Sequence, residues 1–264
     1  MIEKISLENI LFLDIETVPE EAEFSLLDDD KKELFGLKTQ YQRKEDFTPE
    51  EFYDRAGIWA EFGKIVCISV GYFTFKGDIR HFRVTSFYGE EKKILQDFST
   101  LLNTHFNQPQ HIMCGHNAKE FDFPFIARRM IINQVQIPNK LNLFGKKPWE
   151  VPHLDTLEMW KFGDFKHYTS LKLLTKVLNI PSPKDDISGS EVGHVYYVEK
   201  NIDRIIIYCE KDVIAVAQIM LRLRREDLLI DYKLNKRTTY LFDKDKLSKS
   251  ETNYFLLSCG GFSP

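Results

Sequence analysis

The sequence predicts an α/β protein in which helices pack on a mixed β-sheet. The first half of the chain holds several runs of β-branched and aromatic residues, such as the long run 64–75. The second half is dominated by segments whose apolar residues recur at the spacing of amphipathic helices. Strands that come first, with helices interspersed and then dominating, are typical of a sheet covered by helices.

The first half is expected to contain four strands. The segment 10–17 is an apolar run typical of a buried strand, and 112–115 is a shorter one. Lys76-Gly77-Asp78 separates two further runs, which predicts a hairpin. Thr48-Pro49-Glu50-Glu51 combines a capping residue, a proline and acids, the pattern of a helix start. We therefore expect strands at 10–17, 64–75, 78–87 and 112–115, and helices at 20–34, 49–61, 90–106 and 123–132.

The second half is expected to be largely helical and to complete one domain. The helical segments are 157–162, 170–178, 188–199 and 201–225. We expect one domain over residues 1–242, with 19–62 as a helical insertion after the first strand. Residues 243–264 are rich in Lys, Ser and Gly without a clear period, which predicts a mobile or loosely docked tail.

Composition restricts the class of protein only loosely. Hydrophobic residues make up 43% and aromatic residues 13% of the 264 residues, which indicates a packed globular protein. The net charge of −4 neither indicates nor excludes a nucleic-acid binder, because bound divalent ions would cancel several negative charges. The four cysteines lack CxxC spacing and are expected to be reduced thiols rather than zinc ligands. Without an apolar run of membrane-spanning length, a soluble cytoplasmic protein that does not bind membranes is expected.

Asp14 and Glu16 interrupt the first predicted strand. Residues i and i+2 of a strand project from the same face, so both carboxylates are expected to face one spot, with Leu11, Leu13 and Ile15 on the other face. Two like charges about 4 Å apart repel by roughly 4 kcal/mol at an effective dielectric of ~20. A fold that tolerates this pair usually holds a cation there.

Two other segments carry candidate partners for this pair. Asp122 stands where a helix begins, so it is either a helix cap or a further acid of the site, and Asn117 is either a turn residue or a site residue. Tyr208 and Asp212 are four residues apart and share one face of an apolar helix. An ionised Asp on such a helix requires a partner or a metal, whereas Tyr208 alone could be a core tyrosine. Asp155, in His153-Leu-Asp-Thr156, either caps the next helix or supports the site.

Together the strings LDIET, GHNAKEFDFPFIARR and YCEKDV resemble the three motifs of the DEDD exonuclease superfamily, Asp-x-Glu, Asn-x(4)-Asp and Tyr-x(3)-Asp. They are most similar to the proofreading domain of family B DNA polymerases, in order over about residues 8–224. The related subclass has a histidine five residues before the last Asp, where this chain has Ile207; Tyr208 therefore indicates the tyrosine subclass.

The resemblance implies an RNase H-like α/β fold with a five-stranded mixed sheet and a 3′→5′ exonuclease that releases 5′-mononucleotides. It implies two Mg²⁺ or Mn²⁺ ions, with Asp14 between both, and single-stranded DNA as the preferred substrate. The remaining residues are too few for a polymerase domain, which implies a free-standing enzyme or one that serves a polymerase or repair partner in trans. The alternatives are an exoribonuclease and a catalytically silent nucleic-acid or partner-binding module. The implied site is Asp14, Glu16, Asp122 and Asp212 as metal ligands, Tyr208 as a catalytic residue, and Thr17 and Asn117 as contacts to the 3′ nucleotide.

Overall fold

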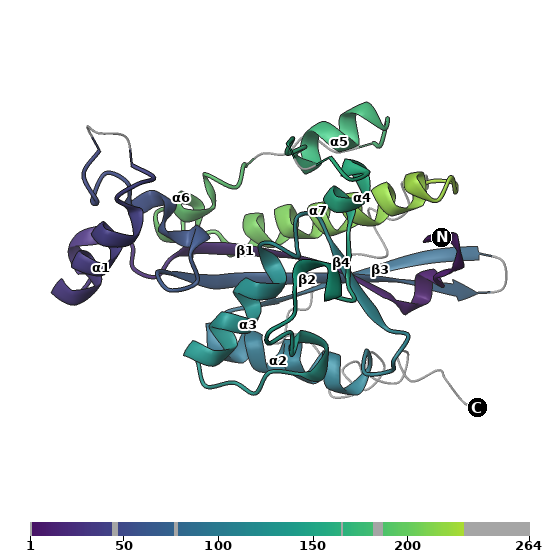
Figure 1. Cartoon of the computed structure of the whole chain (residues 1–264), viewed down its shortest axis with the longest axis horizontal. Helices are drawn as coiled ribbons and strands as arrows, with labels where there is room; N and C mark the ends of the chain where they lie inside the picture. Colours follow the sequence, from purple (N-terminus) through teal and green to yellow (C-terminus); the bar gives the residue numbers. More distant parts are fainter. Residues whose placement is uncertain (1, 44–46, 77–78, 165, 182–186, 230–264) are drawn as a thin grey trace.

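A five-stranded mixed sheet forms the middle layer of the computed structural model (Figure 1). Its strand order is β3-β2-β1-β4-β5. The pairs β3–β2 and β2–β1 are antiparallel, and the pairs β1–β4 and β4–β5 are parallel. The sheet confirms the predicted fold class. The strands are β1 (Ile10–Pro19), β2 (Gly63–Lys76), β3 (Ile79–Tyr88), β4 (Ile112–Gly115) and β5 (Leu154–Asp155). The structure describes residues 2–43, 47–76, 79–164, 166–181 and 187–229.

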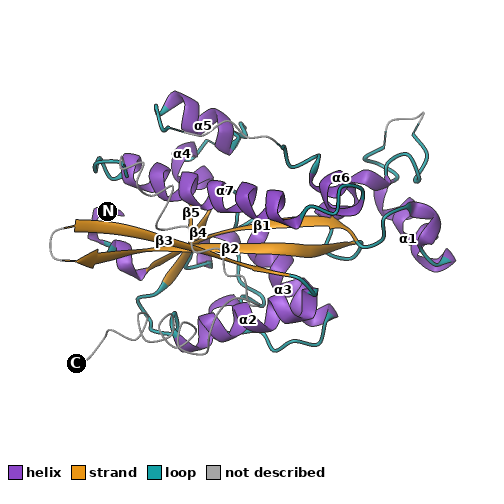
Figure 2. Cartoon of the chain, turned by 180° about the vertical axis from the view of Figure 1, so that it is seen from behind, coloured by secondary structure: helices purple, strands orange, loops and turns teal. Residues whose placement is uncertain are grey.

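Helices cover both faces of the sheet, as Figure 2 shows from behind. One face carries α2 (Glu91–Thr104) and α3 (Asp122–Ile132). The other carries the long α7 and three shorter helices, while α1 lies at one end of the sheet. These helices are α1 (Asp29–Thr39), α4 (Thr156–Lys161), α5 (Leu171–Val177), α6 (Val192–Tyr197) and α7 (Ile202–Leu223).

Strand β1 has two faces with different neighbours. Leu11, Leu13 and Ile15 belong to the hydrophobic cluster that includes residues of α2 and α3. Phe12 and Val18 belong to clusters formed with α7. Side chains alternate between the two faces of a strand, so Asp14 and Glu16 lie on the same face as Phe12 and Val18, as predicted. The acids therefore face α7 from the centre of the sheet.

Two predicted helices are wrong. The helix expected at 20–34 is α1, which begins at Asp29, because Asp28 accepts the Lys31 N–H and caps it there. The segment 49–61 has turns and a 3-10 helix at Tyr53–Ile58 in place of an α-helix, although Thr48 and Glu51 form the expected reciprocal capping bonds. The two-residue β5 was not predicted.

The predicted division of the chain into residues 1–242 and a tail stays a prediction. Residues 19–62 include α1 and the 3-10 helix at Tyr53–Ile58, and residues 243–264 lie outside the described residues. Among the helices that the structure describes, none is long and apolar enough to cross a membrane.

A buried ion pair fixes α3 against α2. Arg129 is 4% exposed, and its guanidinium contacts both carboxylate oxygens of Glu91, at 2.8 and 2.5 Å. It also donates to the Ala60 carbonyl, while Glu91 accepts the Ile65 N–H. The pair thereby joins α2, α3 and the start of β2.

Candidate functional site

Asp14 and Glu16 lie on β1 beyond the point where β4 ends. The parallel pairing of β1 and β4 extends over Ile10–Phe12 of β1. Across β2 the acids pair with Ser69 and Cys67, and the register shifts between Glu16 and Thr17, a β-bulge at the end of the motif. Such bulges re-aim side chains and are common next to active sites. The structure thus places both carboxylates at a local break in the sheet.

Asp122 is brought to this break by the start of α3. Its Oδ1 accepts the Ile15 N–H at 3.2 Å, a bond between residues 107 positions apart in the chain. The helix begins at Asp122 with Phe121 as N-cap residue, so Asp122 bonds to β1 and is not the N-cap of its own helix. The capping alternative is therefore wrong, and Asp122 contacts the strand that bears the first two acids.

Asp155 holds the loop before α3 in place. Its carboxylate accepts the Asn117 N–H at 2.9 Å and the Lys119 N–H at 3.0 Å, and it also accepts the Leu157 N–H at the start of α4. It therefore has both roles that the sequence left open, as helix cap and as support for the site. Asn117 has φ 63°, the left-handed conformation that asparagine tolerates in turns.

Helix α7 presents three polar residues toward β1. Tyr208 and Asp212 line a shared pocket with Asp14. Cys209 is fully buried, and its Sγ lies 3.4 Å from both the carbonyl oxygen and Oδ2 of Asp14. Sequence reasoning missed Cys209 as a site residue. The available signal was its position three residues before Asp212, on the same helix face.

The acids perturb one another electrostatically. Burial, followed by the charges of Glu16, Asp212 and Asp122, raises the pKa of Asp14 well above its ordinary value. Burial and then Asp212 raise the pKa of Glu16 in the same way. Burial, with the Asp155 and Asp212 charges, raises the pKa of Asp122 to about 7. Segments far apart in the sequence thus bring together four carboxylates that repel one another.

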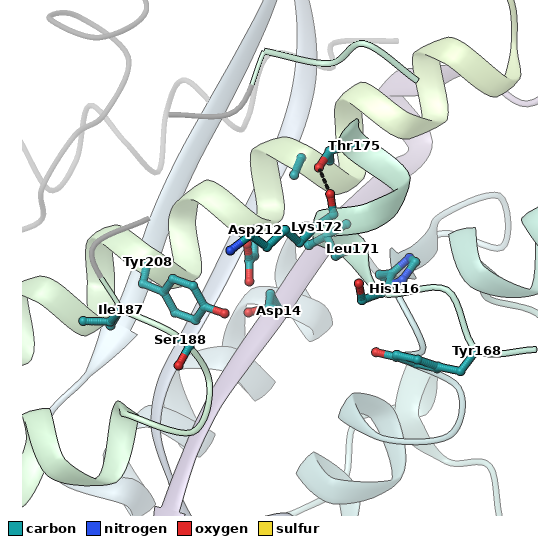
Figure 3. Close-up of a pocket in the computed structure, with 12 residues that line it drawn as sticks. Asp14, His116, Tyr168, Leu171, Lys172, Thr175, Ile187, Ser188, Tyr208 and Asp212 are labelled. Atoms are coloured by element: carbon teal, nitrogen blue, oxygen red, sulfur yellow. Dashed lines mark hydrogen bonds between the residues drawn. The ribbon is translucent and has the colours of Figure 1, made fainter. Parts of the chain in front are cut away.

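A pocket of about 280 Å³ opens beside these acids (Figure 3). Tyr208, Asp212 and Asp14 point into it from α7 and β1, and His116 and Tyr168 lie across from them. The sequence did not single out most of the other lining residues, because they come from α5, α7 and the segments around them. These residues are Ser170, Leu171, Lys172, Thr175, Ile187, Ser188 and Ala215.

The two histidines near the site have structural hydrogen bonds on both ring nitrogens. His116 contacts Thr156 Oγ1 and the Thr169 carbonyl, each at 2.9 Å. His153 Nδ1 accepts the Met113 N–H at 3.2 Å, and its Nε2 lies 2.7 Å from the Lys140 carbonyl. Both are therefore satisfied polar residues rather than candidate ligands.

The carboxylates fit a divalent cation. Asp14 and Glu16 each place one oxygen within 4.8 Å of the other and of Cys209 Sγ. Asp122 and Asp212 lie outside this tight group but close enough to raise the pKa of both acids. Carboxylate oxygens are the ligands that Mg²⁺ and Mn²⁺ prefer. A bound cation would offset the mutual repulsion that burial makes costly.

Comparisons with known proteins assign this architecture to a class. The family model described as the RNase_H superfamily matches residues 55–224, more than half of the chain. The chain therefore belongs to the RNase H superfamily. Membership supports nucleic-acid binding and nuclease activity in general. The resemblance to DEDD-type exonucleases is thus confirmed at the level of the superfamily.

A solved structure was found to be similar to the chain. The chain is similar to the family B DNA polymerase from the hyperthermophilic archaeon Pyrobaculum calidifontis, with 14% sequence identity and a TM-score of 0.46. The match covers 80% of this chain and 24% of the polymerase, so the chain spans about a quarter of that protein's length. No curated protein matches the sequence significantly.

Proposed function

We propose that this protein is a metal-dependent 3′→5′ exonuclease that removes 5′-mononucleotides from single-stranded DNA. The observation that carries the proposal is the convergence of Asp14, Glu16, Asp122 and Asp212 from three segments of the chain, beside a pocket that Asp14 and Asp212 line. Superfamily membership supports a nuclease. The direction of hydrolysis and the DNA substrate rest on the three sequence motifs and their resemblance to proofreading domains.

The four carboxylates would hold two Mg²⁺ or Mn²⁺ ions, which when bound lower the pKa of water and neutralise charge on the leaving 3′-oxygen. The chain itself supplies the positions of these ligands. The Asp122 bond to the Ile15 N–H fixes α3 relative to β1. The Asp155 bonds to the Asn117 and Lys119 N–H groups fix the loop that leads into α3.

Tyr208 would orient the reacting groups rather than remove a proton. A tyrosine hydroxyl has an ordinary pKa of about 10 and stays protonated at neutral pH. The hydroxyl can donate a hydrogen bond to the scissile phosphate and accept one from the attacking water. Tyr208 points into the same pocket as Asp14, which is the position that this role needs (Figure 3).

The 3′-terminal nucleotide would lie in the pocket beside these groups. We propose that Thr17, next to the β-bulge, and Asn117, in the turn before α3, contact this nucleotide. Across from the acids, Tyr168 is 65% exposed and lines the pocket, so its ring is accessible for stacking on a base.

The test is degradation of 5′-labelled single-stranded DNA and RNA of matched sequence with Mg²⁺, Mn²⁺ or EDTA. We expect a metal-dependent ladder that shortens from the 3′ end, with DNA degraded faster than RNA. The variant Asp14→Asn should give no ladder. As a matched control, Asp203→Asn removes an exposed acid in the first turn of the same α7 and should retain full activity.

The outcomes separate the alternatives. Absence of products under every metal condition would favour a silent binding module. Faster degradation of RNA would indicate an exoribonuclease. The enzyme would then distinguish RNA from DNA by the 2′-hydroxyl. A ladder that persists in Asp14→Asn would show that the activity comes from elsewhere.

A further inference from the structure

The carboxylate pair has a sulfur neighbour. Oxygens of Asp14 and Glu16 and the Sγ of Cys209 all lie within 4.8 Å of one another. The Cys209 Sγ is 3.4 Å from Asp14 Oδ2. All three side chains lie between β1 and α7, which pack against each other through the adjoining hydrophobic clusters. The sulfur is therefore held toward the acids by the packing of the helix on the sheet.

Glu16 provides an independent sign of a cation site. It is 7% exposed, and its carboxylate accepts no hydrogen bond from the residues that the structure describes. Its described neighbours include the acids Asp212 and Asp122 and the thiol of Cys67, and none of these is a cation. A buried carboxylate normally has a hydrogen-bond donor or a cation beside it. Its oxygen instead lies in the same tight group as the Asp14 carboxylate and the Cys209 thiol.

The spacing suits a cation that binds both oxygen and sulfur. For a tetrahedral zinc ion with Zn–S of about 2.3 Å and Zn–O of about 2.1 Å, two such ligands lie about 3.6 Å apart. The observed 3.4 Å between Cys209 Sγ and Asp14 Oδ2 is close to this value. Thiolates favour zinc and other soft cations, whereas Mg²⁺ favours oxygen ligands alone.

We propose that Cys209 is a third ligand at the Asp14 and Glu16 centre and that it gives the centre affinity for thiophilic divalent cations, of which zinc is the cellular example. On binding, the thiol proton leaves to solvent and the sulfur binds the cation as a thiolate. Such a cation occupies ligands that the proposed Mg²⁺ or Mn²⁺ ions need, so zinc competes with the activating metal. This inference deepens the proposed function, since it concerns the same metal centre.

The test uses cadmium, a thiophilic probe whose bond to a thiolate absorbs in the ultraviolet. Titrate Cd²⁺ into the full chain carrying Cys259→Ser, which leaves Cys67, Cys114 and Cys209 as its thiols. No nucleic acid is present, so the result does not depend on nuclease activity. We expect a saturable charge-transfer absorption that is lost when Cys209→Ser is added and retained when Cys114→Ser or Cys67→Ser is added.

The two other thiols make strict controls. Both are fully buried; Cys114 lies on β4, whereas Cys67 lies beside Cys209 and Glu16 but outside the tight group. A second variant, Glu16→Gln, keeps every thiol and should weaken Cd²⁺ binding by roughly tenfold or more. This variant keeps the test decisive if Cys209→Ser does not fold.

Three results would overturn the proposal. The first is an absorption that Cys209→Ser leaves unchanged. The second is an absorption that is lost with Cys114→Ser or with Cys67→Ser. The third is a Cd²⁺ affinity that Glu16→Gln does not change. A protein that binds Cd²⁺ as expected but degrades no nucleic acid would overturn the proposed function alone. A protein that degrades DNA but shows no cadmium–thiolate absorption would overturn the role of Cys209 alone.

Discussion

Replacement of Asp122 by asparagine should stabilise the metal-free protein at neutral and alkaline pH. Asp122 is 4% exposed, and burial raises its pKa to about 7. An asparagine at this position keeps an oxygen that accepts the Ile15 N–H, so the bond from α3 to β1 is retained. The substitution therefore removes the buried charge and little else.

The magnitude follows from linkage between proton binding and folding. In the unfolded chain an aspartate has a pKa of about 3.9. Between about pH 4 and about pH 7 the folded state binds more protons than the unfolded state, so stability falls as pH rises. The pKa of Asp122 differs between the two states by about three units, and at 1.36 kcal/mol per unit this corresponds to about 4 kcal/mol. Above about pH 7 the free energy of unfolding is lower by this full amount. Asp122→Asn avoids this loss.

The assay is urea unfolding in EDTA at about pH 5 and about pH 8, where linkage separates the two proteins. We expect the free energy of unfolding of Asp122→Asn to exceed that of the parent protein by up to about 4 kcal/mol at the higher pH. At the lower pH the difference should be smaller. Adding Mg²⁺ should stabilise the parent more than the variant, because the variant lacks one of the proposed ligands.

The same substitution at a nearby acid gives a matched control of opposite sign. Asp155→Asn replaces a carboxylate that accepts the Asn117 and Leu157 N–H groups on Oδ1 and the Lys119 N–H on Oδ2 with an amide, whose NH₂ group must face at least one of these donors. It should lower stability by about 2–4 kcal/mol. Equal effects from both substitutions, or an Asp122→Asn effect independent of pH, would refute the reasoning.

Two further substitutions test the support of the site. Arg129→Met leaves the Glu91 carboxylate without its cation and should cost about 3–5 kcal/mol in urea unfolding, whereas exposed Arg128→Met should change stability by less than about 0.5 kcal/mol. Burial lowers the pKa of His153 to about 4, so stability should rise with pH between about 4 and about 6.5, by up to about 3 kcal/mol. His153→Phe should flatten that dependence, and an unchanged slope would contradict this account.

The sequence alone predicts which acidic side chains share a strand face or a helix face, because their spacing matches the repeat of a strand or of a helix. The two-residue spacing of Asp14 and Glu16 predicts a shared strand face, and β1 has its apolar residues on the opposite face. The four-residue spacing of Tyr208 and Asp212 predicts a shared helix face, and both side chains line one pocket. Local periodicity determines side-chain direction, so these placements needed no knowledge of the tertiary structure.

The features that local sequence patterns left open or missed depend on packing between distant segments. Asp122 looks like a helix cap until β1 is placed beside it, where its carboxylate binds the Ile15 N–H. Cys209 looks like a core thiol until α7 packs on the sheet. The prediction of an α-helix at 49–61 was wrong. The capping bond at Thr48 is present, but the residues that follow form turns and a 3-10 helix at Tyr53–Ile58. Capping patterns specify where a helix can start and do not specify its length.

The most direct test of the central claim compares a linear and a circular single-stranded DNA of the same sequence, each incubated with the protein and Mg²⁺. The account predicts that the linear strand is shortened stepwise from its 3′ end to 5′-mononucleotides, while the circle remains intact. EDTA or Asp212→Asn should abolish the reaction. Cleavage of the circle, products that carry a 3′-phosphate, or full activity in EDTA would contradict a metal-dependent 3′→5′ exonuclease at this site.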